Sequence, residues 1–400
     1  MFHVYYSMRK LTADIIFPIT SAPVKDAVLL ISDENKIIGI EPRNNFLDSE
    51  LEIFSGALIP GFINTHCHLE LSHLRNVFAQ KTGLPAFLEN VTHNRESTDE
   101  EIFSAIAIAE EEMIKNGIVA VADICNTSYT FQQKAKRNLH YHTFIELIGF
   151  NPQSASVVMD NGNKLLAEAH SFGLHASFAP HAPYSVSEEL IERISKHNFE
   201  NNTPTSFHIL ESNDENELYM QGTGLYRKLY RDLKIDISFF KPSGKTSLET
   251  LLPFFNPEVN TLMVHNTIAT PWDLIFAEEL HPNLFWCLCP NANMFIEDRL
   301  PDILTLRNQA QYFTIGTDSL ASNLALDILS ELQLLQKHFP SLQTNELLRW
   351  ATLYGAKFLN LDNEFGSFET GKNPGVVLLK NFNTDTMLLD GSSVQLTVDN

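Results

Sequence analysis

The chain has 400 residues, of which 44% are hydrophobic, so it can bury a core large enough for one large domain or for two or three smaller ones. Its 49 acidic residues outnumber its 28 basic residues and give a net charge of −21, which argues against nucleic acid or an anionic membrane as a partner. Four cysteines are too few for a disulfide framework, and no apolar stretch reaches the length of a membrane span, so we expect a cytoplasmic protein.

Both ends of the chain have the pattern of short β-strands. Residues 27–42 predict two strands around a polar Asp-Glu-Asn turn, and the segment that begins at Gly366 alternates short apolar runs with Gly, Asn and Asp. We therefore predict a small β domain assembled from residues 1–58 and 363–400, with a larger domain at 59–362.

The larger domain alternates apolar, β-branched runs with polar segments that carry helix signals. The eight apolar runs lie at residues 61–65, 118–124, 143–148, 175–180, 205–210, 261–265, 284–289 and 312–317. Thr98 and Glu101 are spaced to cap a helix that ends at Gly117, and Thr270 is placed to cap one that begins at Pro271. This alternation predicts a parallel sheet covered by helices. Eight units favour a closed (β/α)8 barrel, and a doubly wound open sheet is the alternative.

Residues of the types that bind metals follow five of these eight runs. They are His66 and His68 after the first run, His181 after the fourth, His208 and Glu211 at the fifth, His265 at the sixth and Asp318 after the eighth. In a barrel the carboxyl ends of the strands gather on one rim, where enzymes of this fold keep their active sites. Each residue has a structural alternative: a single histidine at a strand end is often only hydrogen-bonded, and Asp318 is also placed to cap a helix. The shared position at strand ends favours the functional interpretation.

A ligand set of three histidines and one carboxylate suits Zn²⁺, and less specifically Fe²⁺ or Mn²⁺. Such an ion lowers the pKa of a bound water from ~15.7 toward ~7, and this water then needs a base. Glu211, three residues after His208, would face the opposite side of a continued strand. The strand must therefore break for Glu211 to turn inward as that base; otherwise Glu211 is an exposed acid of the run "ESNDENE".

The pattern resembles the amidohydrolase superfamily, in particular its cytosine-, guanine- and adenosine-type aminohydrolases. The segments that carry the resemblance are "PGFINTHCH", "APHAPYS", "HILES", "VHNT" and "GTDSLASN", and "GSFETGKNPGVVLL" is similar to the tail of the family. The family usually has Gly-Lys-x-Ala-Asp-Leu in that tail, whereas this chain has Asn373-Pro374-Gly375-Val376 after Lys372.

The resemblance implies a distorted (β/α)8 barrel with one divalent metal ion, expected to be Zn²⁺ with Fe²⁺ as the alternative. The ligands that it implies are His66, His68, His208 and Asp318. It implies Glu211 as the proton shuttle, His265 as the residue that orients the attacking water, and Asp318 as a further help in proton transfer. Two-metal branches carry a lysine at the end of strand four; this chain has His181 there and no lysine between Lys164 and Lys196.

We therefore expect hydrolytic deamination of an amino-substituted heterocycle, most simply an adenosine-like purine compound. "LELSHLRN" and "DSLASN" are similar to enzymes that deaminate 6-amino-6-deoxyfutalosine. His181, Glu70 and Arg299 are the expected substrate-binding residues, with His181 and Glu70 on a ring nitrogen and on sugar hydroxyls. The partner is a small molecule, and a homodimer is possible for this fold. The alternatives are a hydrolase with another leaving group, by ring opening or dechlorination, and an inactive barrel that serves as a scaffold.

Overall fold

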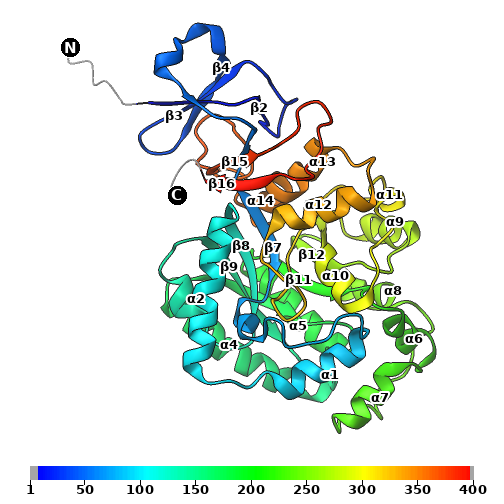
Figure 1. The fold of residues 1–400 in the computed structure, drawn as a ribbon. Coiled ribbons are helices and arrows are strands. Elements are labelled where there is room, and N and C mark those ends of the chain that lie inside the picture. The colour runs from blue at the N-terminus through cyan, green and yellow to red at the C-terminus, as the bar shows by residue number, and fades with distance from the viewer. Residues whose placement is uncertain (1–7, 397–400) are drawn as a thin grey trace. The chain divides into compact units, whose positions relative to one another are not determined.

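The computed structural model describes residues 8–396, so the first seven and last four residues of the expected β domain lie outside it. The described chain divides into two units within a mixed α/β fold (Figure 1). The first unit contains the residues up to Asn64, Glu111–Ala120 and the residues from Asp327 onward, and the second contains Thr65–Glu110 and Val121–Leu326. Within residues 8–396, no helix is both long enough and apolar enough to cross a membrane.

The first unit is built on two four-stranded sheets, with the strand orders β4-β3-β1-β5 and β16-β15-β6-β2. The strands are β1 (Arg9–Thr12), β2 (Ile15–Ile16), β3 (Ala27–Ile31), β4 (Ile37–Pro42), β5 (Glu52–Ile53), β6 (Ala57–Pro60), β15 (Val376–Lys380) and β16 (Ser393–Leu396). Its helices are α12 (Ile328–His338), α13 (Thr344–Arg349) and α14 (Gly355–Phe358). Strand β15 pairs antiparallel with β6, with Val377 opposite Ile59, and Leu58 and Leu378 share one buried core with Leu11 and Leu29. Strand β6 from the N-terminal part and strand β15 from the C-terminal part of the described chain thus lie in one sheet.

Each of the eight apolar runs overlaps a strand, which confirms the predicted alternation. The strands are β7 (Phe62–Cys67), β8 (Ile118–Cys125), β9 (His140–Leu147), β10 (His175–Pro180), β11 (Thr205–Ile209), β12 (Thr261–His265), β13 (Leu284–Leu288) and β14 (Phe313–Ile315). They form two sheets of four, in the orders β10-β9-β8-β7 and β11-β12-β13-β14. The pairs β9–β10, β11–β12, β12–β13 and β13–β14 are parallel.

The two sheets contact each other at both edges, near the carboxyl ends of the strands. Cys67 at the end of β7 forms a parallel bridge with Asp318, and the backbone N–H of Asp318 donates to the carbonyl of His66 at 3.0 Å. At the other edge, the N–H of His208 donates to the carbonyl of His181, also at 3.0 Å. These contacts bring together the strand ends that carry the candidate site residues.

Helices of the second unit follow the strands and cover them on the outside; α4, for example, packs against β9 and β10 (Figure 1). They are α1 (Leu84–Asn94), α2 (Asp99–Lys115, of which the residues from Glu111 onward belong to the first unit), α3 (Phe131–Lys134), α4 (Ala155–Ser171), α5 (Glu188–Glu200), α6 (Asn213–Gln221), α7 (Leu225–Asp232), α8 (Ser247–Leu251), α9 (Pro271–Leu280), α10 (Pro290–Glu297) and α11 (Ile303–Leu306). The predicted caps are confirmed: Thr98 and Glu101 exchange hydrogen bonds at the start of α2, and Thr270 accepts from the N–H of Asp273 at the start of α9.

A buried ion pair fixes the segment that follows β7. The Lys134 ammonium lies 2.6 Å from the Asp123 carboxylate, and neither side chain is exposed. The other carboxylate oxygen of Asp123 accepts the backbone N–H of Leu69 at 2.7 Å, directly after His68. Burial alone would lower the pKa of Lys134, but the Asp123 carboxylate reverses this effect and holds the pKa above its ordinary value. Lys134 therefore stays protonated, and the Asp123 carboxylate ties the His68 segment to β8.

Replacing Lys134 with methionine should strongly destabilise the protein, because Asp123 would remain as a buried carboxylate without its cation. Breaking a buried pair in this way costs about 3–5 kcal/mol. We expect a clearly lower melting temperature in calorimetry. The control is Lys196→Met, which removes a cation that lies 3.9 Å from Glu200 on the surface and should leave the melting temperature unchanged. Equal melting temperatures of the two variants would contradict the structural role of the pair.

Candidate metal centre and substrate cavity

Three histidine rings converge on one point at the ends of β7 and β11. The Nε2 atom of His68 lies 3.2 Å from Nε2 of His66 and 3.2 Å from Nε2 of His208. All three side chains are buried, and their ring nitrogens lie within 4.8 Å of one another. The Asp318 Oδ1 atom is 3.8 Å from the His66 nitrogen and 3.7 Å from the His68 nitrogen. Four of the predicted site residues are therefore in one place.

The protonation of the histidines suits metal binding. The Nδ1 atom of His208 lies 2.7 Å from the carbonyl oxygen of His181, which can only accept, so Nδ1 carries the hydrogen and Nε2 presents its lone pair. Burial lowers the pKa of His66 and of His208 well below the ordinary range, and the neighbouring histidines lower both further. Neutral imidazole is the form that coordinates a metal. The nitrogen and carboxylate donors of this cluster therefore fit a divalent cation.

Glu211 lies beside the cluster because the strand breaks where the sequence requires it. Strand β11 ends at Ile209, and Leu210 has a φ of +53°, in the left-handed region. The carboxylate of Glu215 accepts the N–H groups of Leu210 and Glu211 at 2.9 and 3.3 Å and so holds this turn. Only 4% of Glu211 is exposed, which excludes the alternative of an exposed loop acid. Burial, followed by the Asp318 and Glu215 carboxylates, raises the pKa of Glu211 well above its ordinary value.

His265 faces Glu211 across the same space. The Nε2 atom of His265 lies 3.6 Å from the Glu211 carboxylate, and its Nδ1–H donates to the Asn293 side-chain oxygen at 2.9 Å. That hydrogen bond fixes the ring and leaves Nε2 as the acceptor. His265 has a φ of +75° and Asp318 has a φ of +56°. Such strained residues cluster at functional sites, because the surrounding structure must hold them.

A cavity of about 160 Å³ opens in front of these residues. Its lining includes His68, His208, Glu211, His265 and Asp318, together with His181, Glu70, Glu146, Arg95 and Tyr184. A larger hollow of about 530 Å³ adjoins it, since Glu70, Thr92, Arg95 and Asn126 line both. The site therefore has room for a substrate that extends away from the histidines.

The three expected substrate-binding residues fall in different places. His181 lines the cavity at the end of β10, and its ring lies 5.0 Å from that of His208. Glu70 also lines the cavity, but its carboxylate binds the loop at Asn126 and Thr127. Arg299 is exposed and is not part of the cavity lining.

Several residues of the site escape sequence reasoning. Glu146 at the end of β9 lines the cavity, Arg95 donates to Glu70 and Asn126, and Ser322 donates to the Asp318 carboxylate at 2.6 Å. Glu146 carries the same signal as the histidines, a polar side chain at the end of a strand, but the apolar Leu147 and Ile148 follow it and hide that signal. Ser322 lies in the segment "GTDSLASN" that carries the resemblance, whereas no local pattern marks Arg95.

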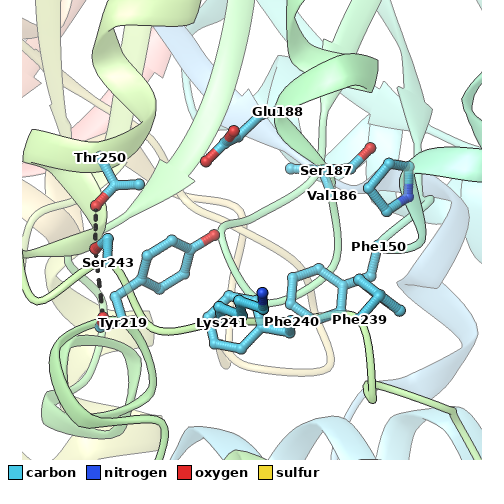
Figure 2. A pocket seen from close by; sticks show the side chains of 11 residues that line it. Phe150, Val186, Ser187, Glu188, Tyr219, Phe239, Phe240, Lys241, Ser243 and Thr250 are labelled. Atoms are coloured by element: carbon cyan, nitrogen blue, oxygen red, sulfur yellow. Dashed lines mark hydrogen bonds between the residues drawn. The ribbon is translucent and has the colours of Figure 1, made fainter.

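A second cavity in this unit, of about 170 Å³, has a different character (Figure 2). The rings of Phe150, Phe239, Phe240 and Tyr219 surround it, and the hydroxyl groups of Ser243 and Thr250 bind each other at its edge, 2.7 Å apart. Among its described lining residues there is no histidine and no cysteine. This cavity shares no lining residue with the histidine site and lacks its chemistry.

Comparison with known proteins places the chain in a family. The model of the Amidohydrolase family matches residues 57–394, so the chain belongs to that family, whose members depend on metals. An adenosine deaminase of Helicobacter pylori is 28% identical over 80% of this chain and 77% of its own length. The structure of Helicobacter pylori aminofutalosine deaminase in complex with methylthio-coformycin has a TM-score of 0.83 at 23% identity and covers 98% of each chain. A zinc-bound adenosine deaminase of Xanthomonas campestris has a TM-score of 0.74 at 20% identity, over 97% of this chain and 91% of its own.

Substitution of Gly316, behind the cluster, should displace His66. A Cβ atom at this position would lie 2.7 Å from the His66 Cβ and 2.9 Å from its carbonyl oxygen, closer than real contacts allow. We expect Gly316→Ala to lower the metal content of the purified protein, measured by elemental analysis, and to lower its melting temperature. Gly39→Ala is the control, because nothing lies within 4 Å of a Cβ atom there. A normal metal content in Gly316→Ala would argue that the position of His66 does not matter for metal binding.

Proposed function

We propose that this protein hydrolytically deaminates an adenosine-like purine compound and releases ammonia, with 6-amino-6-deoxyfutalosine as the first candidate. The observation that carries the proposal is the buried Glu211 carboxyl, held beside the convergent histidines in one cavity. Family membership and the deaminase names of the similar proteins support it. We further infer that the eight strands close into a (β/α)8 barrel within residues 59–362, because the two sheets contact each other at both edges.

In this proposal His66, His68, His208 and Asp318 would hold one divalent ion, Zn²⁺ first and Fe²⁺ second. When bound, such an ion supplies a water whose pKa lies near ~7. One ion is the number that this ligand set supports, because the end of β10 carries His181 where two-metal branches carry a lysine. None of the four cysteines forms a disulfide, which supports a reducing compartment such as the cytoplasm.

The side chains around the ion would move the protons. Glu211 accepts a proton from the attacking water and delivers it to the ring nitrogen next to the reacting carbon; its raised pKa suits this exchange near neutral pH. His265, fixed by Asn293, orients the water through Nε2. Asp318, fixed by Ser322, takes part in passing the proton to the leaving amine. His181 lies on the cavity wall, where its ring can bind a ring nitrogen of the base.

An ammonia-release screen tests the function directly. The panel contains adenosine, 5′-deoxyadenosine, methylthioadenosine, S-adenosylhomocysteine, aminodeoxyfutalosine, guanine, cytosine and aminated triazines. We expect turnover of one or more of the adenosine-type nucleosides. Turnover restricted to guanine, cytosine or triazines would reject the adenosine-type pocket, and release of chloride or of a ring-opened acid without ammonia would reject deamination.

Replacement of Glu211 by glutamine should remove the proton shuttle but keep the shape of the site. We expect kcat to fall by roughly 10²–10⁴-fold, the usual contribution of a general acid–base group, while metal content and melting temperature stay close to those of the wild type. The matched control is Glu217→Gln, which makes the same change at an exposed position of the following helix α6. Full activity of Glu211→Gln would mean that another residue carries the proton.

A further inference from the structure

Glu146 lines the cavity and carries one carboxylate oxygen without a hydrogen-bond partner. The residue is the second to last of β9, is only 6% exposed and lines the cavity together with His181 and Glu211. Its Oε2 atom accepts from the side-chain amide of Asn126 at 3.3 Å, but its buried Oε1 atom has no hydrogen-bond partner. A buried acceptor without a partner is unfavourable by about 1–3 kcal/mol or more when it is charged. The position therefore suits an acceptor that receives its hydrogen bond from a bound ligand.

The chemistry of an adenosine-like ligand limits which of its groups can donate a hydrogen bond to Glu146. A carboxylate can only accept hydrogen bonds, so it needs a donor. The ring nitrogens of adenine that are not bonded to the sugar carry lone pairs and no hydrogen, and the exocyclic amino group must lie at the metal for the reaction. The remaining donors of a purine ribonucleoside are the hydroxyl groups of its sugar.

Glu70, the residue that the sequence suggests for this role, has no comparable free oxygen. Its Oε2 atom accepts from the Thr127 hydroxyl at 2.6 Å and from the backbone N–H groups of Asn126 and Thr127 at 3.2 Å each. Its Oε1 atom lies 3.4 Å from the Arg95 guanidinium. Glu70 thus organises the loop that carries Asn126, and Asn126 in turn orients Glu146.

A cation is the other ligand that these side chains suggest, because ligand atoms of Glu146, His181 and His208 also lie within 4.8 Å of one another. The Nδ1 atom of His208 is the one near Glu146, at 3.9 Å, and it carries a hydrogen that it donates to the His181 carbonyl. A cation here would have to displace that hydrogen. The geometry favours a neutral donor from the substrate.

We propose that Glu146 is a specificity-determining residue that accepts a hydrogen bond from the 2′- or 3′-hydroxyl of the substrate ribose. The proposal rests on the function proposed above and assigns to Glu146 the selection of ribonucleosides over deoxynucleosides. A site built to bind a hydroxyl rejects the analogue that lacks it, because its own polar group is then left unpaired.

The test compares kcat/KM for the most active purine ribonucleoside of the panel with the values for its 2′-deoxy and 3′-deoxy analogues. We expect the wild-type enzyme to prefer the ribonucleoside over one of the analogues by roughly 10–100-fold, the strength of a hydrogen bond to a charged group. Glu146→Gln should lose most of this preference through a lower kcat/KM on the ribonucleoside, with little change on the sensitive analogue.

Four further measurements make the outcome decisive. Glu70→Gln should change all three substrates by the same factor, since it loosens the loop, and Glu168→Gln on the exposed face of α4 should behave as wild type. If Glu146→Gln does not fold, Glu146→Asp, which withdraws the carboxylate but keeps its charge, should show a reduced preference. Metal analysis should give the same metal content per chain for the wild type and for Glu146→Gln.

Equal rates of the wild type on all three nucleosides, or an unchanged preference in the Glu146 variants, would overturn the role of Glu146 and leave deamination standing. If only Glu70→Gln lost the preference for the ribonucleoside over its deoxy analogue, Glu70 and not Glu146 would bind the sugar hydroxyl. A second metal ion that is present in the wild type and lost in Glu146→Gln would mean that Glu146 binds a cation and not a sugar hydroxyl. Failure of the wild type on every purine nucleoside would overturn the proposed function, and this inference with it.

Discussion

Three imidazole rings are brought together in a small buried space, and the rest of the site depends on this arrangement. Ring nitrogens 3.2 Å apart repel each other where both present a lone pair, unless a cation or a proton lies between them. Burial disfavours the protonated rings, since it lowers the pKa of His66 and of His208. A divalent metal ion would resolve this conflict, and the Asp318 carboxylate would supply negative charge beside it.

The backbone holds strained conformations so that the side chains reach this space. Leu210, His265 and Asp318 all have positive φ values, and each lies where a strand has just ended. Residues of this kind cost on the order of 1–3 kcal/mol each, which the surrounding contacts must offset. The Glu215 carboxylate holds the turn at Leu210, and the N–H of Asp318 donates to the His66 carbonyl. Strain and support thus occur together at the strand ends.

Three buried acids around the cavity differ because their hydrogen-bond partners differ. Glu70 binds a loop and an arginine, Glu146 has one oxygen bound by Asn126 and one without a hydrogen-bond partner, and Glu211 faces a histidine among other carboxylates. In the proposed mechanism the same functional group would serve three purposes: in Glu70 it holds a loop, in Glu146 it would present an acceptor, and in Glu211 it would exchange a proton. Position along the sequence would not separate these cases, since Glu146 lies within an apolar run and Glu70 and Glu211 lie close behind one.

The sequence by itself determined the alternation of strands and helices and the strand ends at which His66, His208, His265 and Asp318 lie. These features follow from local periodicity, capping residues and the common direction of parallel strands. Only the tertiary structure decided which acids face the cavity, that Arg299 lies on the surface, and that Asp123 and Lys134 form a buried pair. These depend on contacts between residues from different elements, and no local pattern encodes the partner that a buried polar group finds.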